Sequence, residues 1–329
     1  MVKYKVCVVT VTYGDRRRFL EQVIKRALSF GQVVKIVVVN NASAYEIPGS
    51  NDKVVVLNNT ENKGSAGGYK QGISYANDNV ACDFIWLLDD DNLPELACLD
   101  NLLLEWDTIN GADNKKALFC FRDDRAAHVK IAQGEDTGRY YLVENNFLGF
   151  HFGRIFYNQY HKIADRFKKN GSYKEHVGMP YVPYGGLLLH KKLVAEIGFP
   201  DERFFLYVDD SEYSYRITQN GGTIWLIPSS KIMDIDKSQG INYKKRMFHS
   251  QLLDQWNFRT YYHVRNRIYF YSSVAIKNNF VFKINKVLYL AFLQIISVLS
   301  SKKSAYHKLV IAVNDGLKGN LGKANPDKF

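Results

Sequence analysis

Apolar runs alternate with helix-like segments along the first part of the chain. Val6–Val11, Val33–Val39 and Asp83–Leu88 are nearly continuous apolar runs, and Lys53–Leu57 is a shorter one. Such runs are typical of strands buried on both faces of a parallel sheet. Between the first two runs, Arg16–Phe30 carries apolar residues at helical spacing. This order predicts an open α/β sheet, mostly parallel and flanked by helices.

Later segments continue the alternation and then become helical. Leu187–His190 and Thr223–Ile227 predict strands, while Lys191–Ile197 and Ser211–Asn220 predict helices that end at glycines. From Phe248 onward three helical patterns dominate. We therefore expect a catalytic domain over 1–245, with halves 1–115 and 116–245, and a helical region over 246–329.

Charge distinguishes this helical region from the rest of the chain. The net charge is +11, and basic residues are concentrated in the C-terminal third. This indicates an anionic partner such as phosphate, a membrane surface or nucleic acid, although a solvated basic face is the alternative. Apolar stripes between Phe280 and Val313, with lysines at the ends, suit a helix on an anionic membrane or one packed within the protein. The most apolar stretch, Val287–Leu299, has 13 residues, which is too short to span a bilayer.

The cysteines and the N-terminus bear on location. The four cysteines lack metal-type spacing, and Cys7 and Cys82 lie in apolar surroundings, which favours a reducing compartment. The first residues lead directly into a predicted strand, and we therefore expect no signal peptide. We expect a cytoplasmic protein, peripheral on the inner face of the cell membrane, and the sequence leaves a homo-oligomer open.

The acidic run Asp89-Asp90-Asp91 follows an apolar strand directly. Three adjacent carboxylates repel one another unless a cation lies among them. Mg²⁺ or Mn²⁺ bound by one or two carboxylates together with phosphate oxygens would supply that cation. A solvated turn, or a helix cap at Asp91, is the plainer interpretation.

A second acidic cluster, Asp209-Asp210 with Glu212, precedes a predicted helix. Helix capping explains it in part. In a mostly apolar segment, however, one of two adjacent aspartates should have a raised pKa, which suits removal of a proton from a hydroxyl. Asp234 and Asp236 could reach the metal or lie in a surface turn.

A glycine-rich loop, Asn62–Gly68, lies between the third strand and the acidic triplet. Taken alone, it is also explained by a plain tight turn. Bare backbone opening a helix can approach a phosphate or a sugar. The spacing matches neither a Walker A loop nor a dinucleotide fingerprint. The strand ends at Thr12, Asn40 and Asp89 should converge on one crevice, because ligands bind such sheets at the carboxyl ends of their strands.

Taken in order, these motifs resemble the inverting family 2 glycosyltransferases with the GT-A fold, over roughly residues 4–270. The resemblance rests on Val9–Tyr13, Val38–Ser43, Asn62–Gly68, Trp86–Asp91, Gly198–Phe205 and Asp209–Asp210. The glycine-rich loop together with the acidic triplet looks most like the galactofuranosyl- and rhamnosyltransferases that build bacterial polysaccharides. It implies a UDP-sugar donor, a glycan or polyprenyl-linked acceptor, a divalent metal and no nucleic acid.

The resemblance also implies roles for individual residues. Asp210 would be the catalytic base. Donor contacts would come from Thr12, Tyr13, Asn40, Asn41, Lys63, Gly64, Gly67, Gly68, Asp89, Asp90 and Arg265. The acceptor side would comprise Trp86, Tyr184, Gly185, Gly186 and Asp209, and the metal ligands would be Asp89, Asp91 and Asp234. Two positions depart from the family pattern, because Asn40 replaces a usual Asp and Asp234 falls where many relatives have His.

Two other functions remain as alternatives. A sugar nucleotidyltransferase would need a phosphate-gripping loop after the first strand, where the sequence offers only Arg16 to Arg18 nearby. A carbohydrate- or DNA-binding module would fit the aromatic and basic composition but would leave both acidic clusters without a role.

Overall fold

The computed structural model describes residues 3–47, 52–167, 171–236, 243–244 and 246–329. The chain forms two compact units. The first consists of 1–137, 173–205 and 209–240, and the second of 138–172, 206–208 and 241–329. Residues 138–172, which the sequence analysis assigned to the acceptor half, therefore group with the C-terminal helices.

A nine-stranded sheet forms the centre of the first unit, in the order β3-β2-β1-β4-β8-β6-β9-β5, with β7 paired to β9. The strands are β1 Val6–Thr12, β2 Val33–Asn40, β3 Val54–Asn58, β4 Phe84–Asp89, β5 Asn92–Pro94, β6 Lys116–Phe121, β7 Val177–Met179, β8 Leu187–His190 and β9 Thr223–Asp234. The first four run parallel, as predicted. The rest of the sheet is mixed, because β8 lies antiparallel between β4 and β6, and β5 and β7 are antiparallel to β9. Strands β6 and β9 are parallel to each other and, across β8, run in the direction of β4, so the expectation of a mostly parallel sheet is confirmed, with β5, β7 and β8 as the antiparallel strands.

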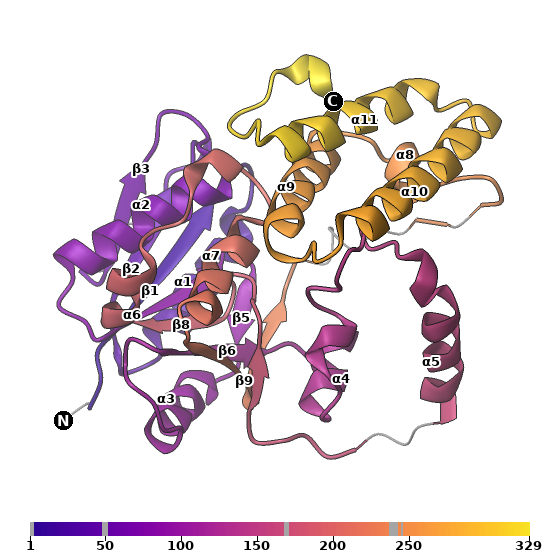
Figure 1. Ribbon diagram of the computed structural model, residues 1–329. Helices are drawn as coiled ribbons and strands as arrows, with labels where there is room; N and C mark the ends of the chain where they lie inside the picture. The colour runs from indigo at the N-terminus through magenta and orange to yellow at the C-terminus, as the bar shows by residue number, and fades with distance from the viewer. Residues whose placement is uncertain (1–2, 48–51, 168–170, 237–242, 245) are drawn as a thin grey trace. The chain divides into compact units, whose positions relative to one another are not determined.

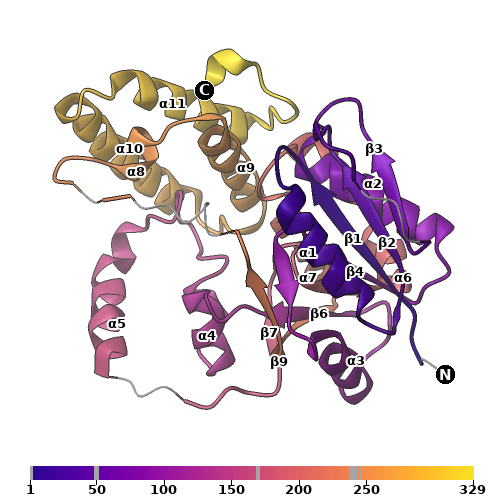
Figure 2. The ribbon, with the colours of Figure 1, turned by 180° about the vertical axis from the view of Figure 1, so that it is seen from behind.

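Helices cover both faces of this sheet (Figures 1 and 2). They are α1 Arg17–Leu28, α2 Gly64–Asn79, α3 Cys98–Thr108, α4 Ala126–Ala132, α6 Lys191–Ile197 and α7 Asp209–Gln219, with the 3-10 turn η3 Glu202–Phe204. The turn η1 Thr137–Arg139 lies at the point in the chain where the first unit ends and the second begins. Helix α2 begins inside the glycine-rich segment that was predicted to be a loop. Its glycines let it pack closely on β1, since a Cβ at Gly68 would lie 2.6 Å from Val11 Cγ1.

Trp86 lies in the core on the face of the sheet opposite α2. Trp86 is completely buried and packs edge-on against Phe30, with their ring centroids 5.7 Å apart. It belongs to one apolar cluster with residues of α1 and α3. The prediction that Trp86 contacts the acceptor is therefore corrected, because its side chain points into the core from the middle of β4.

The second unit is helical, as predicted. Its helices are α5 Ile155–Phe167, α8 Gln251–Asp254, α9 Phe258–Val274, α10 Asn279–Leu299 and α11 Lys303–Lys318, with 3-10 turns η2 Phe152–Arg154 and η5 Pro326–Lys328. Helices α9 and α11 pack tightly, because a Cβ at Gly316 would lie 2.4 Å from the carbonyl oxygen of Arg265. Helix α10 has 21 residues and is, by length and composition alone, long and apolar enough to cross a membrane. The sequence-based statement that this region is too short to span a bilayer is thereby corrected.

Candidate active site

The carboxyl ends of three neighbouring strands bring the first predicted residues together. Thr12 at the end of β1 pairs with Asn40 on β2, and Val11 pairs with Asp89 on β4. Asp89, Asp90 and Asp91 thus leave the sheet beside Thr12, at the edge where parallel sheets bind ligands.

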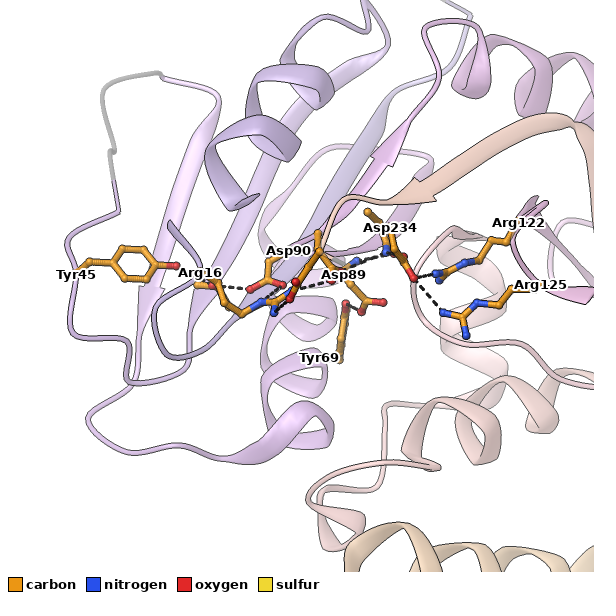
Figure 3. Close-up of polar contacts among 12 residues, drawn as sticks. Arg16, Tyr45, Tyr69, Asp89, Asp90, Arg122, Arg125 and Asp234 are labelled. Carbon is orange, nitrogen blue, oxygen red and sulfur yellow. Dashed lines mark hydrogen bonds and ion pairs between the residues drawn. The ribbon is translucent and has the colours of Figure 1, made fainter. Parts of the chain in front are cut away.

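Arg16 lies among the acidic side chains at this edge. Its guanidinium forms three ion pairs of 2.7 Å, with Asp90, Asp91 and Asp236. Asp90 also accepts a 2.7 Å hydrogen bond from the hydroxyl of Thr12, which lies 2.8 Å from the hydroxyl of Tyr45 (Figure 3). A protein cation therefore occupies part of the acidic triplet, where the sequence predicted a metal alone.

Asp89 points to the other side of the triplet, towards α2. The hydroxyl of Tyr69 donates to Asp89 Oδ1 at 2.7 Å, and the Tyr69 ring stacks on Tyr184 with 4.0 Å between centroids. The next residue, Gly185, has no room for a side chain, since a Cβ would lie 1.9 Å from Asn92 Oδ1 and 2.5 Å from Asp89 Oδ2. The Tyr184-Gly185 backbone thus forms one wall of the acidic site.

The triplet is held in an environment that disfavours its charge. Burial raises the pKa of Asp89, Asp90 and Asp91 to about 6 each. The charge of Asp89 further raises the pKa of Asp91, while Arg16 opposes this rise. The negative charges of Asp90 and Asp210 also raise the pKa of Asp89. Asp210 therefore lies within electrostatic range of the triplet, although 120 residues separate them in the chain.

Asp234 is fixed at the edge of the same cluster by β5 and two arginines. Asn92 Nδ2 donates to Asp234 at 2.7 Å, and Asn92 Oδ1 accepts from the backbone N–H of Asp89 at 3.1 Å. Arg122 forms a short ion pair with Asp234, and Arg125 forms another at 2.9 Å (Figure 3). Asn92 thus joins strands β4 and β9 at the site.

The second acidic pair begins helix α7. Asp209 is 2% exposed and accepts from Ser65 Oγ of α2 at 2.9 and 3.0 Å. Burial and the neighbouring charge of Asp210 raise the pKa of Asp209 well above its usual range. Asp210 is half-buried, and its carboxylate accepts from the backbone N–H of Ser211 at 2.6 Å. Burial raises its pKa, while the Ser211 bonds lower it.

The backbone before this pair is strained. Tyr207 and Val208 both have φ of 66°, and Phe205 has φ of 62°. Positive φ is unusual for bulky residues and an outlier for a β-branched one, and it costs on the order of 1–3 kcal/mol each. Such strain is concentrated at functional sites in other proteins. It supports a functional role for the Asp209-Asp210 turn.

Asn41 and the glycine-rich segment form a separate, mostly structural network. Asn41 is 2% exposed, its amide donates to Asn62 and to the Gly64 carbonyl, and its oxygen accepts from the Lys63 backbone. Gly64 has φ of 72°, and a Cβ there would overlap the carbonyl oxygen of Phe205. In the structure the side chain of Asn41 and the buried glycines, Gly67 included, are engaged in packing and hydrogen bonding, while the Lys63 side chain is exposed.

A hollow of about 570 Å³ opens beside Asn40 at the ends of β2 and β3. Its lining includes Ser43, Tyr45, Val56 and Asn58. The Asn40 amide donates to Asn58 at 3.0 Å, and its oxygen accepts from the backbone of Ser43 at 2.8 Å. Tyr45 lines this hollow and also contacts Thr12, so the hollow adjoins the acidic triplet.

The remaining predicted residues have different settings. Tyr13 is 50% exposed beside the strand end. Gly186 has φ of 103° and packs against Cys120 in the core. Arg265 belongs to the helical unit, where it is buried, donates to the carbonyl of Gly322 at 2.7 Å and lies over the ring of Tyr262. A structural role within α9 therefore accounts for Arg265.

The carboxylates of the site supply only part of the ligand set that a divalent cation needs. The charge of Asp89 raises the pKa of Asp91, and Mg²⁺ or Mn²⁺ is commonly held by one or two carboxylates together with phosphate oxygens. Asp234 is already paired with two arginines. Among the residues that the structure describes, no three His, Cys, Asp or Glu side chains form a ready-made metal site. The site therefore suits a metal ion that binds together with a phosphate-bearing ligand, because the phosphate oxygens would complete its coordination.

Several residues of the site were not predicted from the sequence, among them Arg16, Tyr69, Asn92 and Arg122. Tyr69 lies within the helix that follows the glycine-rich segment, one turn from Ser65, and so shares a helix face with it. That spacing is a usable signal for Tyr69, whereas Asn92 meets Asp234 across 142 residues and gives no local signal.

Comparisons with known proteins agree with this architecture. Residues 7–120 match the sequence profile of the family described as Glycosyl transferase family 2. The chain matches no curated protein sequence. One similar solved structure is GalNAc-T7 with UDP, GalNAc and Mn²⁺, with a TM-score of 0.55 and 14% identity, covering 82% of this chain and 50% of that one. Another is TarS from S. aureus, with a TM-score of 0.50 and 9% identity, covering 94% of this chain and 55% of that one.

These matches establish the fold, which is the predicted GT-A type. The chain spans about half the length of the two similar structures. The family match begins in β1 and ends in β6, so it contains the acidic triplet but not Asp210. It supports the prediction of a glycosyltransferase.

Proposed function

We propose that the chain is a metal-dependent inverting glycosyltransferase that moves a sugar from a nucleoside diphosphate onto a bacterial surface polysaccharide or a lipid-linked glycan. The family match over 7–120 supports the reaction class. The observation that carries the assignment is the shared contact with α2, where Ser65 donates to Asp209 and Tyr69, one turn further along, donates to Asp89. The pair that holds the candidate base and the triplet that holds the candidate metal ligands therefore lie against the same helix, and the charge of Asp210 raises the pKa of Asp89.

The donor would bind along the carboxyl ends of β1, β2 and β4. The hollow beside Asn40 and Tyr45 suits a nucleobase and ribose, and it adjoins the triplet through the contact between Tyr45 and Thr12. The diphosphate would then reach Asp89 and Asp91. These two carboxylates would hold a divalent cation, which would supply positive charge to the diphosphate.

Asp210 would take the proton from the acceptor hydroxyl that attacks the anomeric carbon. Helix α7 begins at Asp209, and its first turn favours a carboxylate at that position through the helix dipole. The bonds from Ser65 to Asp209 fix the turn against α2. Tyr69 would orient Asp89, and Tyr184, which is 3% exposed, would support Tyr69 from beneath.

The finer specificity is part of the proposal. We favour UDP-galactofuranose as the donor, since the glycine-rich segment and the acidic triplet resemble that branch of the family, with dTDP-rhamnose as the alternative. A nucleotidyltransferase is less well supported, because Arg16 is already held by three carboxylates and is not free to grip a triphosphate.

The direct test is a panel of nucleotide sugars incubated with the full chain and Mn²⁺. Release of nucleoside diphosphate from one donor, faster with an acceptor glycan, would support the proposal. Release of pyrophosphate from a sugar phosphate and a nucleoside triphosphate would instead indicate nucleotidyl transfer. Turnover of dTDP-rhamnose but not UDP-galactofuranose would keep the reaction class and change the donor.

A further inference from the structure

Helix α10 has an apolar face that the helical unit leaves uncovered. Its buried residues follow helical spacing: Phe282, Asn285, Leu293 and Ile296. The exposed residues on the opposite side are almost all apolar: Phe280, Ile284, Val287, Leu288, Phe292, Ile295, Val298 and Leu299. Phe280 is 71% exposed and Val287 61% exposed. A continuous exposed apolar face of this size marks an interaction surface.

Helix α5 of the same unit carries a second apolar row. Phe156, Tyr160, Ile163 and Phe167 recur at helical spacing and are all exposed, with Phe156 and Phe167 each at 83%. Figures 1 and 2 show α5 as a helix with no other helix of its unit laid along its length. The unit therefore exposes apolar side chains on two of its helices.

The charge of this unit selects the partner. Lys and Arg outnumber Asp and Glu by 21 to 5 in the ranges that form it, whereas the sheet-containing unit has 23 basic and 28 acidic residues. Helix α10 itself contains Lys283 and Lys286 and no acidic residue. Exposed apolar side chains within a strongly basic surface fit an anionic lipid bilayer, to which both features contribute affinity.

Two other occupants fit less well. A second copy would bring two strongly basic units together, and like charges oppose such contact. A bilayer-spanning α10 would have to separate from its own unit, because Asn285 on its buried face accepts from the backbone N–H of Phe152 and donates to the carbonyl of Asn145. Those bonds keep one face of α10 on the protein and leave only the opposite face for lipid.

We propose that the helical unit docks on the surface of an anionic membrane through the exposed apolar face of α10 and the lysines around it. The helix lies in the plane of the interface, with Phe292 and Ile295 inserted between lipids. Lys283 and Lys303, both exposed, contact the headgroups. This proposal needs no sugar substrate, so it stands or falls separately from the glycosyltransferase assignment.

Co-sedimentation of the full chain with lipid vesicles tests it. We expect binding to vesicles that contain phosphatidylglycerol and weak binding to phosphatidylcholine alone. The double variant Phe292→Glu/Ile295→Glu should lower partitioning at least about tenfold. Leu104→Glu, the same change at a 64% exposed leucine on α3 of the acidic unit, should not affect it. Unchanged melting temperatures would show that both proteins are folded.

Charge is tested separately with Lys283→Gln/Lys303→Gln. Each lysine near an anionic surface contributes to the binding free energy. Losing both lysines should therefore lower partitioning into the vesicles by about tenfold or more. High salt should weaken binding as the screening length falls from about 10 Å at 0.1 M to about 3 Å at 1 M.

Three results would overturn the proposal. One is equal binding by the wild type and the Phe292→Glu/Ile295→Glu variant. Another is a dimer that this variant dissociates, with no vesicle binding by the wild type. The third is retention of the protein in membranes after alkaline extraction, which would indicate a spanning helix.

Discussion

Arg16 Nη2 lies 2.7 Å from Asp91 Oδ2. The residue predicted to hold a metal is therefore already paired with a cation from the protein itself. The same guanidinium also binds Asp90 and Asp236, so it organises the acidic cluster before any ligand arrives. A metal bound by Asp89 and Asp91 would add to this arrangement and share Asp91 with Arg16.

Arg16→Gln should destabilise the metal-free protein by roughly 2–4 kcal/mol, because three carboxylates lose their cation. This destabilisation lies towards the low end of the range for breaking a buried ion pair, because the Arg16 side chain remains 19% exposed. Mn²⁺ should raise the melting temperature of this variant more than that of the wild type. Arg17→Gln, which removes an exposed pair with Glu21, is the control and should change little. An equal effect of Mn²⁺ on both variants would argue against Asp91 as a ligand.

The acidic triplet predicts an unusual pH dependence. Its pKa values of about 6 lie above the ordinary aspartate value, so the folded state binds protons more tightly than the unfolded state. The triplet's contribution to stability is therefore present at low pH and is lost as pH rises from about 4 through 6. Asp89→Asn should flatten the fall in melting temperature between pH 5 and pH 7. Metal affinity should rise over the same window, because ligand carboxylates must ionise. A wild-type slope unchanged by Asp89→Asn would contradict this account.

Tyr69→Phe removes only the hydroxyl that donates to Asp89 and keeps the ring that stacks on Tyr184. That hydrogen bond lowers the pKa of Asp89, so its loss should raise the pKa and leave less carboxylate at neutral pH. We expect Mn²⁺ affinity, measured by calorimetry in the presence of UDP, to fall about tenfold. Tyr75→Phe, a change further along α2, should leave it unaltered. Equal Mn²⁺ affinity in the Tyr69→Phe and Tyr75→Phe variants would show that the Tyr69 hydroxyl does not affect metal binding.

Gly185→Ala should disable the site while leaving the rest of the sheet intact. Its new Cβ would collide with Asn92 Oδ1 and Asp89 Oδ2. The displaced Asn92 side chain would then lose its hydrogen bonds to the Asp89 backbone and to Asp234. Overpacking of this kind typically costs about 1–3 kcal/mol. Gly31→Ala is the matched control, since nothing lies within 4 Å of its added Cβ. Transfer activity and melting temperature should both fall in Gly185→Ala alone.

The strand ends could be predicted because β-branched runs define them. Val6–Val11 and Val33–Val39 each came within one residue of the observed strand, so the edge carrying Thr12, Asn40 and Asp89 followed. The antiparallel direction of β8 could not be recognised, since three leucines and a histidine do not reveal strand direction. Direction depends on long-range pairing, which a local pattern does not encode.

The side chains of the site were less predictable than its position. The acidic residues were recognisable because adjacent carboxylates after a buried strand are costly without compensation. Their partners were not, because Arg16, Asn92 and Arg122 reach them from segments remote in sequence or from positions without any pattern. Asn41 and Gly64 had the composition of a ligand loop, yet the same features serve an internal hydrogen-bond network.

The central claim is that Asp210 acts as a base across the site from a metal held by Asp89 and Asp91. Its most direct measurement is the rate of UDP release and sugar transfer by Asp210→Asn, alongside UDP binding by the same protein. We predict a loss of about 10²–10⁴-fold in turnover with donor binding retained, while Glu212→Gln, in the same helical turn, remains active. Near-normal transfer by Asp210→Asn, or an equal loss of donor binding and turnover, would contradict the account.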